Sequence, residues 1–169
     1  IVMSVMNGFK TDLTKKILGL NPHVIIEPNG FKIEDTFINE LKTKFKNISI
    51  SKTYSGEGIV VSNQNAKGII IKGVDTSISE GLEILKKNIT SGNIAKFKKK
   101  TVFIGAELAF DLDLKVGDKI NLMSSAFVVT PFGGLPKQES LTIAGIFNTG
   151  FYEFDHNFIF LNLPDALSL

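Results

Sequence analysis

One stretch of this 169-residue chain constrains its fold more than any other, the segment Asn121 to Gln138 (NLMSSAFVVTPFGGLPKQ). Apolar, strand-forming runs flank it at 116–123 and 141–147. Its middle holds Thr130-Pro131 and Gly133-Gly134. Because proline removes a backbone donor and glycine allows positive φ, these residues predict that strand pairing ends here and that the chain makes a projecting turn.

The tip of this segment is unusually apolar for a surface loop. It carries Phe127, Val128, Val129, Phe132 and Leu135, and exposed apolar patches tend to mark contact sites. Two interpretations fit these residues. The loop folds back over the core of its own domain, or it forms a protruding hairpin that binds another protein.

Composition limits the class of protein. Hydrophobic residues make up 43% of the chain and charged residues 21%, which is typical of a globular protein. A net charge of +2 is too small to indicate nucleic-acid binding, and the absence of cysteine excludes disulfides and thiol chemistry. The chain starts at Ile1 without a signal-peptide pattern, so we expect an excised fragment. No apolar run approaches the roughly 18–20 residues that cross a bilayer, so we expect the fragment itself to be soluble.

Hydrophobic spacing predicts a mixture of helices and strands. Helices are expected at 1–20, 33–45, 78–89, 106–114 and from 164 onward. Strands are expected at 23–27, 48–54, 58–62, 66–74, 101–105, 119–123, 141–147 and 158–161. This order indicates an α+β fold, with a polar break at 75–81 as the candidate boundary between subdomains. Fourteen phenylalanines and no tryptophan predict a core built largely on Phe rings.

The sequence offers no catalytic motif. His23 and His156 lack the neighbouring cysteine or histidine that a metal site needs, and no nucleophile elbow or phosphate-binding glycine motif is present. Glu153 and Asp155 could serve as paired carboxylates, although a solvated turn is the favoured interpretation. We therefore expect a non-enzymatic chain without a cofactor or metal.

Four segments in order resemble one family: IVMSVMNGFKTDLTKKILGLNPHVII, IIIKGVD, VFIGAELAFDLDLKVGDKINLMS and TPFGGLPKQESLTIAGIFNTGFYEFDHNFIFLNLPDA. Together they are similar to the periplasmic domain of LolC/LolE permease subunits, which belong to the lipoprotein-releasing ABC transporter within the MacB/FtsX-like group. The resemblance covers nearly the whole chain, and MSVMNGF, LKVGDKI and TPFGGLP are its most specific parts.

The resemblance implies a MacB-like core domain. A discontinuous Porter-like subdomain would comprise 1–74 and 150–169. An inserted Sabre-like subdomain would comprise 75–149 and carry a protruding β-hairpin hook at 124–136. Residues 1–20 would extend transmembrane helix one. The domain would lie in the periplasm, between the first two of four spans of an inner-membrane protein of a Gram-negative bacterium.

The resemblance also implies a function. In LolC-type subunits this hairpin recruits the periplasmic lipoprotein carrier LolA, whereas LolE-type subunits lack it, so TPFGGLP implies a LolC-like or combined LolC/LolE form. The other implied partners are the ATPase subunit LolD, a partner permease subunit and lipoprotein cargo, with no nucleic acid. The implied contact residues of the hook are Phe127, Val128, Val129, Thr130, Pro131, Phe132, Gly133, Gly134, Leu135 and Pro136.

The base of the hook departs from the family pattern. Family members place basic side chains beside a glutamine there. In this chain Gln138 matches the glutamine, but Asn121 and Glu139 stand where arginines are expected. Either the carrier has adjusted its charge, or Lys119 and Lys137 supply the basic groups.

Two other functions remain open. The domain could be a MacB-like efflux or FtsX-like signalling domain that contacts a different periplasmic partner. Alternatively, its phenylalanines could line a cavity for a lipid or another small molecule.

Overall fold

The computed structural model describes residues 24–28, 33–62, 65–76, 82–131 and 133–169. It contains two compact units, 1–50 and 51–169, which are described separately. In the first unit, helix α2 (Asp35–Lys44) confirms the helix predicted at 33–45. The strand predicted at 23–27 is wrong for residues 24–27, which form no strand, because the described part of this unit offers no second strand to pair with. The predicted helix 1–20 and His23 lie outside the described residues.

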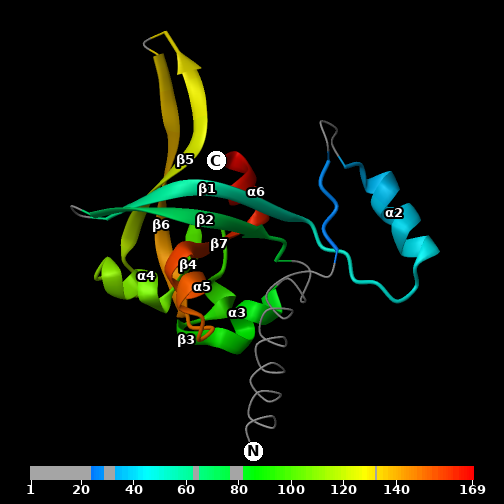
Figure 1. Ribbon diagram of the computed structural model, residues 1–169, viewed down its shortest axis with the longest axis horizontal. Coiled ribbons are helices and arrows are strands. Elements are labelled where there is room, and N and C mark those ends of the chain that lie inside the picture. Colours follow the sequence, from blue (N-terminus) through cyan, green and yellow to red (C-terminus); the bar gives the residue numbers. More distant parts are fainter. Residues whose placement is uncertain (1–23, 29–32, 63–64, 77–81, 132) are drawn as a thin grey trace, which may run out of the picture. The chain divides into compact units, whose positions relative to one another are not determined.

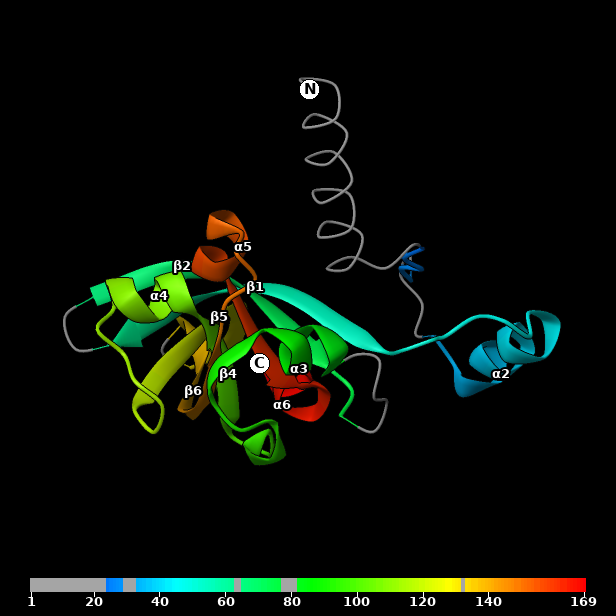
Figure 2. The same cartoon turned by 90° about the horizontal axis from the view of Figure 1, so that it is seen from below.

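The second unit is a mixed α/β structure (Figure 1). Its strands are β1 (Thr53–Ser62), β2 (Asn65–Val74), β3 (Ile89–Gly92), β4 (Thr101–Gly105), β5 (Lys119–Thr130), β6 (Gly133–Phe147) and β7 (Phe158–Asn162). Its helices are α3 (Glu83–Asn88), the short 3-10 helix η2 (Ile94–Lys96), α4 (Ala106–Asp111), α5 (Tyr152–Asn157) and α6 (Leu163–Ser168). Helices α4 and α5 lie next to each other, as Figure 2 shows. None of the helices in the described parts of the chain has the length and apolar character needed to span a bilayer.

The strands of this unit form a closed circuit of pairing. Along the sheet the order is β3-β6-β4-β7-β2-β1-β5, and β5 also pairs with β6. The path β6–β4–β7–β2–β1–β5 therefore returns to β6, and among the described strands only β3 lies outside it. The pairs β2–β7 and β4–β6 are parallel, and the others are antiparallel. Closure of this kind removes most free strand edges.

Two buried clusters lie on opposite faces of the central strands. On β4, Val102 and Ile104 belong to an aliphatic cluster, whereas Phe103 between them belongs to an aromatic one, as the period of two along a strand requires. The aliphatic cluster draws on every strand of the circuit, with Val60, Ile71, Val102, Leu122, Ile143 and Ile159 among its members. The aromatic cluster contains Phe97, Phe103, Phe147 and Phe160. The expected core of Phe rings thus describes only one of the two.

Several predicted elements are present with shifted ends. Strand β4 matches its prediction. The strand predicted at 58–62 and the last two residues of the strand predicted at 48–54 form one strand, β1, because Gly56 and Gly58 lie inside it rather than breaking it. Residues 48–52 form no strand, so the prediction is wrong for them. The helix predicted at 106–114 ends at Asp111, and Asp113 adopts the left-handed conformation with φ 49°.

Three described elements were not predicted, β3, η2 and α5. Residues 91–93 were expected to close a helix, but 89–92 form β3, which pairs along β6. Helix α5 occupies a segment for which no element was expected. The subdomain division into 1–74 plus 150–169 and 75–149 stays a prediction. In the structure β7 pairs with both β2 and β4, so strands from the two predicted subdomains share one sheet.

Candidate functional site

The predicted loop is the outer part of a long hairpin formed by β5 and β6. Residues 119–123 pair with 138–142 close to the body of the unit, and 127–130 pair with 133–136 further out. Between these stretches β5 advances four residues while β6 advances two, so β5 contains a bulge. The outer half extends away from the other strands (Figure 1).

The turn is tighter than the sequence predicts. Pairing continues to Thr130 opposite Gly133, so only Pro131 and Phe132 connect the strands. Gly133 and Gly134 lie within β6 and do not end the pairing, which corrects the expectation that they would. Gly133 has φ 117°, a conformation that glycine adopts without a steric penalty.

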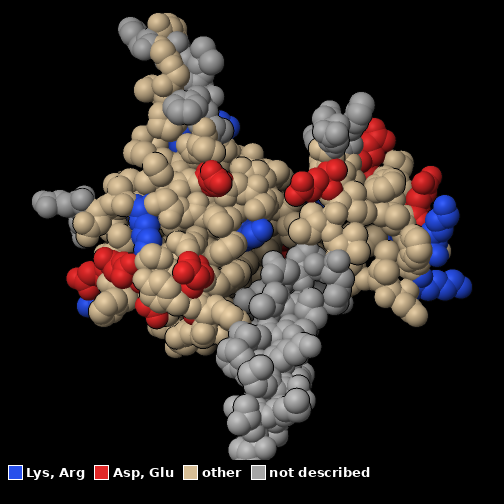
Figure 3. Space-filling view, viewed as in Figure 1, with Lys and Arg blue, Asp and Glu red and all other residues tan. Residues whose placement is uncertain are grey.

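The described residues of the tip face solvent. Leu135 is 57% exposed, Pro131, Gly133 and Gly134 are exposed, and Pro136 is half-buried. Backbone positions 127–130 form the end of β5, and Phe132 lies outside the described residues. The described part of the hairpin is almost free of charge in Figure 3. This arrangement favours the projecting hairpin over a loop folded back on its own core.

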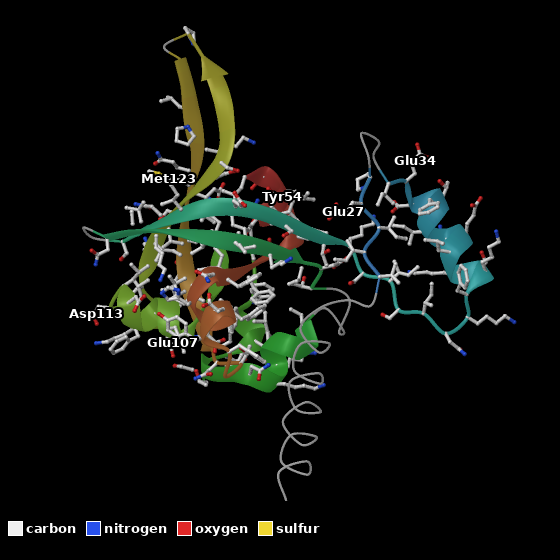
Figure 4. The ribbon with its side chains drawn as sticks, in the orientation of Figure 1. Glu27, Glu34, Tyr54, Glu107, Asp113 and Met123 are labelled. Atoms are coloured by element: carbon white, nitrogen blue, oxygen red, sulfur yellow. The ribbon has the colours of Figure 1, made fainter. Side chains whose placement is uncertain are left out.

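A third strand supports the base of the hairpin. Residues 58–61 of β1 pair with 121–124 of β5, with Ile59 opposite Met123, and Met123 lies at this crossing in Figure 4. A Cβ atom on Gly58 would lie 2.7 Å from the Met123 carbonyl oxygen, so the close approach of β1 requires a glycine. The sequence predicted a strand at 58–62 but not its pairing with β5, because about sixty residues separate β1 from β5.

The predicted base residues gather at this crossing. Asn121 is opposite Val61 on β1 and Ser140 on β6, while Gln138 and Glu139 are opposite Met123 and Leu122. Asn121 and Gln138 are exposed, and Glu139 is half-buried. Their backbone positions therefore lie together where β1, β5 and β6 meet, and their role as the base of the hook stays a prediction.

The two lysines near the base differ in their contacts. Lys137 Nζ donates to the Ser168 carbonyl oxygen at 3.1 Å, which ties the hairpin to the last turn of α6. Lys119 is exposed and makes no ion pair with any residue in the described ranges. Of the two, Lys119 is the cation that is available to a partner without breaking a contact.

A second polar cluster joins β2, α4 and α5. Lys67 Nζ donates to Asp111 Oδ2 at 2.9 Å, and His156 Nε2 lies 2.7 Å from the same oxygen. Lys67 and His156 also contact each other directly, and Tyr152 stacks on His156. The hydrogen bonds from Lys67 and His156 lower the pKa of Asp111. Sequence reasoning missed this cluster, because its members are more than forty residues apart.

The Asp111→Asn variant is expected to be less stable than the unaltered chain at pH 7. Because the pKa of Asp111 is lowered in the folded state, its contribution is present above the unfolded value and is lost as pH falls through the folded one. The difference between the two chains should therefore shrink below about pH 4. Urea unfolding at pH 7, 5 and 3.5 measures it.

Asp113→Asn is the matched control for this prediction. Asp113 lies two residues further on and is exposed, and asparagine tolerates its left-handed conformation. This variant should show no loss at any of the three pH values. A stability deficit of Asp111→Asn that persists unchanged at pH 3.5 would contradict the assigned role of the carboxylate.

Glu153 and Asp155 differ in their exposure to solvent. Glu153 is exposed, but Asp155 is only 2% exposed. The Asp155 carboxylate accepts hydrogen bonds from the backbone N–H of Thr149 at 2.9 Å, from the Thr149 hydroxyl at 2.9 Å and from the Gly150 N–H at 3.1 Å. Asp155 thus fixes the connection from β6 to α5, and the expectation of a solvated turn is wrong for this residue. Among the described residues, no cluster of three or more His, Asp or Glu side chains could hold a metal ion.

Comparison with known proteins shows which proteins the chain is similar to in sequence. No protein-family model matches it. A LolC lipoprotein-releasing system transmembrane protein from Haemophilus influenzae is 30% identical over 170 residues, which cover 98% of this chain and 42% of that protein. LolC from Xylella fastidiosa is 22% identical over 166 residues. LolE from Haemophilus influenzae is 25% identical over 171 residues. This chain is similar to LolC/LolE-type permease subunits over nearly its whole length.

The chain spans about two fifths of the length of these curated relatives. A solved structure shares its fold. The extracellular domain of the noncanonic ABC-type transporter YknZ from Gram-positive bacteria aligns with a TM-score of 0.55 over 89% of this chain and 69% of that one. Their sequence identity is 12%, so this match concerns the fold alone.

Proposed function

We propose that this domain belongs to a LolC-type permease of a lipoprotein-releasing ABC transporter, and that the outer β5–β6 hairpin is a hook that recruits the periplasmic carrier LolA. One observation carries the proposal: the hairpin projects from a closed set of strands and ends in the apolar TPFGGLP turn, with Leu135 57% exposed. An uncharged projection with apolar residues suits docking, because a small set of apolar anchors dominates the energy of an interface.

The proposed role needs no catalytic residue in this domain. ATP hydrolysis belongs to the separate subunit LolD, and a partner permease subunit completes the transporter. The hook holds the carrier beside the permease while lipoprotein cargo passes from the inner membrane toward the outer membrane. The domain lies in the periplasm, with Porter-like and Sabre-like subdomains as in the MacB-like group. The similarity of the fold to an extracellular permease domain supports this placement.

The test is a titration of purified LolA from the same organism into the 169-residue chain, followed by calorimetry. We expect a one-to-one complex whose heat of binding is saturable. A pull-down from periplasmic extract provides a second result that separates this function from its rival. Recovery of an efflux adaptor or an activator of cell-wall hydrolases, together with no heat from LolA, would overturn the proposed function.

A further inference from the structure

The outer half of the hairpin has two strand edges of different character. Residues 127–130 of β5 and 133–136 of β6 pair with each other, and neither segment pairs with another described strand. Each strand therefore has one inner edge, used by its partner, and one outer edge. An outer edge with free N–H and C=O groups is a template for another strand.

The position of Pro136 shows which backbone groups point outward. Opposite residues of an antiparallel pair alternate between hydrogen-bonded pairs and pairs whose N–H and C=O groups point away. Pro136 is opposite Phe127 and has no N–H, so the ladder is complete only if this pair is of the outward type. By alternation, Val129 and Gly134 form the next outward pair. The outer edge of β5 then presents the N–H and C=O groups of Phe127 and Val129.

The two outer edges are protected to different degrees. The edge of β6 loses one donor at Pro136 and has Lys137 next to it, and both are devices that block strand addition. On β5 no proline and no charged residue occurs from Ile120 to Thr130. Only the β5 edge is therefore suited to accept another strand.

The β5 edge also continues an interface that the chain already uses. Strand β1 pairs with 121–124 on the side of β5 that is opposite β6, and its pairing with β5 ends at Gly58. The same side of β5 continues outward beyond the bulge to Thr130. A strand of a partner would thus take up the edge where β1 leaves it and extend the same ladder.

We propose that an extended strand of the LolA carrier pairs along the outer edge of β5 at 125–130, through the backbone groups of Phe127 and Val129. The inference rests on the proposed function and adds the mode of recognition. In this mode backbone hydrogen bonds supply affinity, and the apolar tip supplies specificity. A second copy of this chain is the competing occupant, and the experiment distinguishes the two.

The experiment compares three variants of the full chain by calorimetric titration with LolA. Val129→Pro removes the outward N–H of β5. Proline is tolerated on an edge strand where the N–H faces solvent, so the variant should fold. Val129→Ala keeps that N–H and shortens only the side chain. Gly134→Pro removes the outward N–H of β6 in the same residue pair.

We expect Val129→Pro to weaken binding by roughly ten-fold or more, and by several-fold more than either Val129→Ala or Gly134→Pro, because one hydrogen bond is lost and the ring obstructs the incoming strand. In the unaltered complex the amides of Phe127 and Val129 should become protected from hydrogen exchange. Equal losses for Val129→Pro and Gly134→Pro, without amide protection, would overturn the edge pairing while leaving the hook function standing.

Two further outcomes are decisive. A free chain that is dimeric in sedimentation, and that becomes monomeric only in Val129→Pro, would assign the edge to a second copy and overturn the carrier as its occupant. No binding of LolA by the unaltered chain would overturn the proposed function and this inference with it.

Discussion

Replacing residues 129–134 with Asn-Gly is expected to weaken LolA binding about 100-fold or more, which corresponds to about 2.7 kcal/mol. The replacement removes the turn and six of the ten proposed contact residues. It moves the turn back by two residue pairs, so that Val128 and Leu135 flank the new turn. Because hydrogen-bonded and outward pairs alternate along an antiparallel ladder, this pair is of the same type as the Thr130–Gly133 pair that it replaces. Asn-Gly is the preferred sequence for a two-residue hairpin turn. Calorimetric titration with LolA measures the loss.

The shortened chain should keep its fold, because the circuit of strands and both buried clusters lie outside the excised residues. Its urea midpoint and circular dichroism spectrum test this. Phe110→Ala is the matched control, since Phe110 is a large apolar residue on α4 with 84% exposure and lies outside the hook. If the shortened chain and Phe110→Ala both bind LolA like the unaltered chain, the hook does not recruit the carrier.

Local sequence signals predicted the elements whose ends are marked by special residues. The Gly105 to Ala106 junction ends β4 and begins α4 at the expected position. The prediction treated Gly56 and Gly58 as a break between two strands. Glycine within a strand can mark either a break or a close approach of another backbone, and the sequence does not distinguish the two. The structure shows that at Gly58 the reason is the approach of β5.

Pairing between distant segments could not be predicted from local patterns. The circuit closes through β1 and β5, whose apolar alternation shows that each is a strand but does not identify its neighbour. Helix α5 is six residues long and has both polar and aromatic residues. It is fixed by the buried Asp155 carboxylate rather than by helix propensity. A single sequence contains no signal for such a tertiary contact.

The candidate site was predictable in part for the same reason. Proline and glycine between two strand-forming runs indicated a projecting turn, and the described backbone of 127–136 has that form. The supporting strand β1 at Asn121 and the contact of Lys137 with Ser168 depend on the folded arrangement. The sequence therefore predicted the tip of the hairpin better than its base.

Gly105→Ala is expected to lower the free energy of unfolding by about 3 kcal/mol or more. A Cβ atom at this position would lie 1.9 Å from the Asp155 carbonyl oxygen and 2.5 Å from its carbonyl carbon. These are backbone atoms, so no side-chain rotation relieves the overlap. For a chain of this length the loss corresponds to a melting temperature lower by roughly 6–12 °C.

Neither side of this contact can move easily. Gly105 is paired with Phe147 at the end of β4, where α4 begins. On the other side, the Asp155 N–H donates to the Phe151 carbonyl oxygen at 2.9 Å, and its buried carboxylate holds the Thr149 and Gly150 amides. Separating the two would break one of these sets of hydrogen bonds, and a buried donor left without an acceptor costs about 1–3 kcal/mol.

Gly68→Ala is the control variant that tests whether the loss of stability comes from the contact between Gly105 and the Asp155 backbone. Gly68 lies in β2, where an added Cβ would meet nothing within 4 Å. Alanine there should be neutral or stabilise the chain by up to about 1 kcal/mol, because it restricts the unfolded state. The two variants make the same chemical change in strands of the same circuit, so their urea midpoints should move in opposite directions or by very different amounts. Similar small shifts for both would show that α5 is not held against the end of β4, and the position assigned to Asp155 would then be wrong.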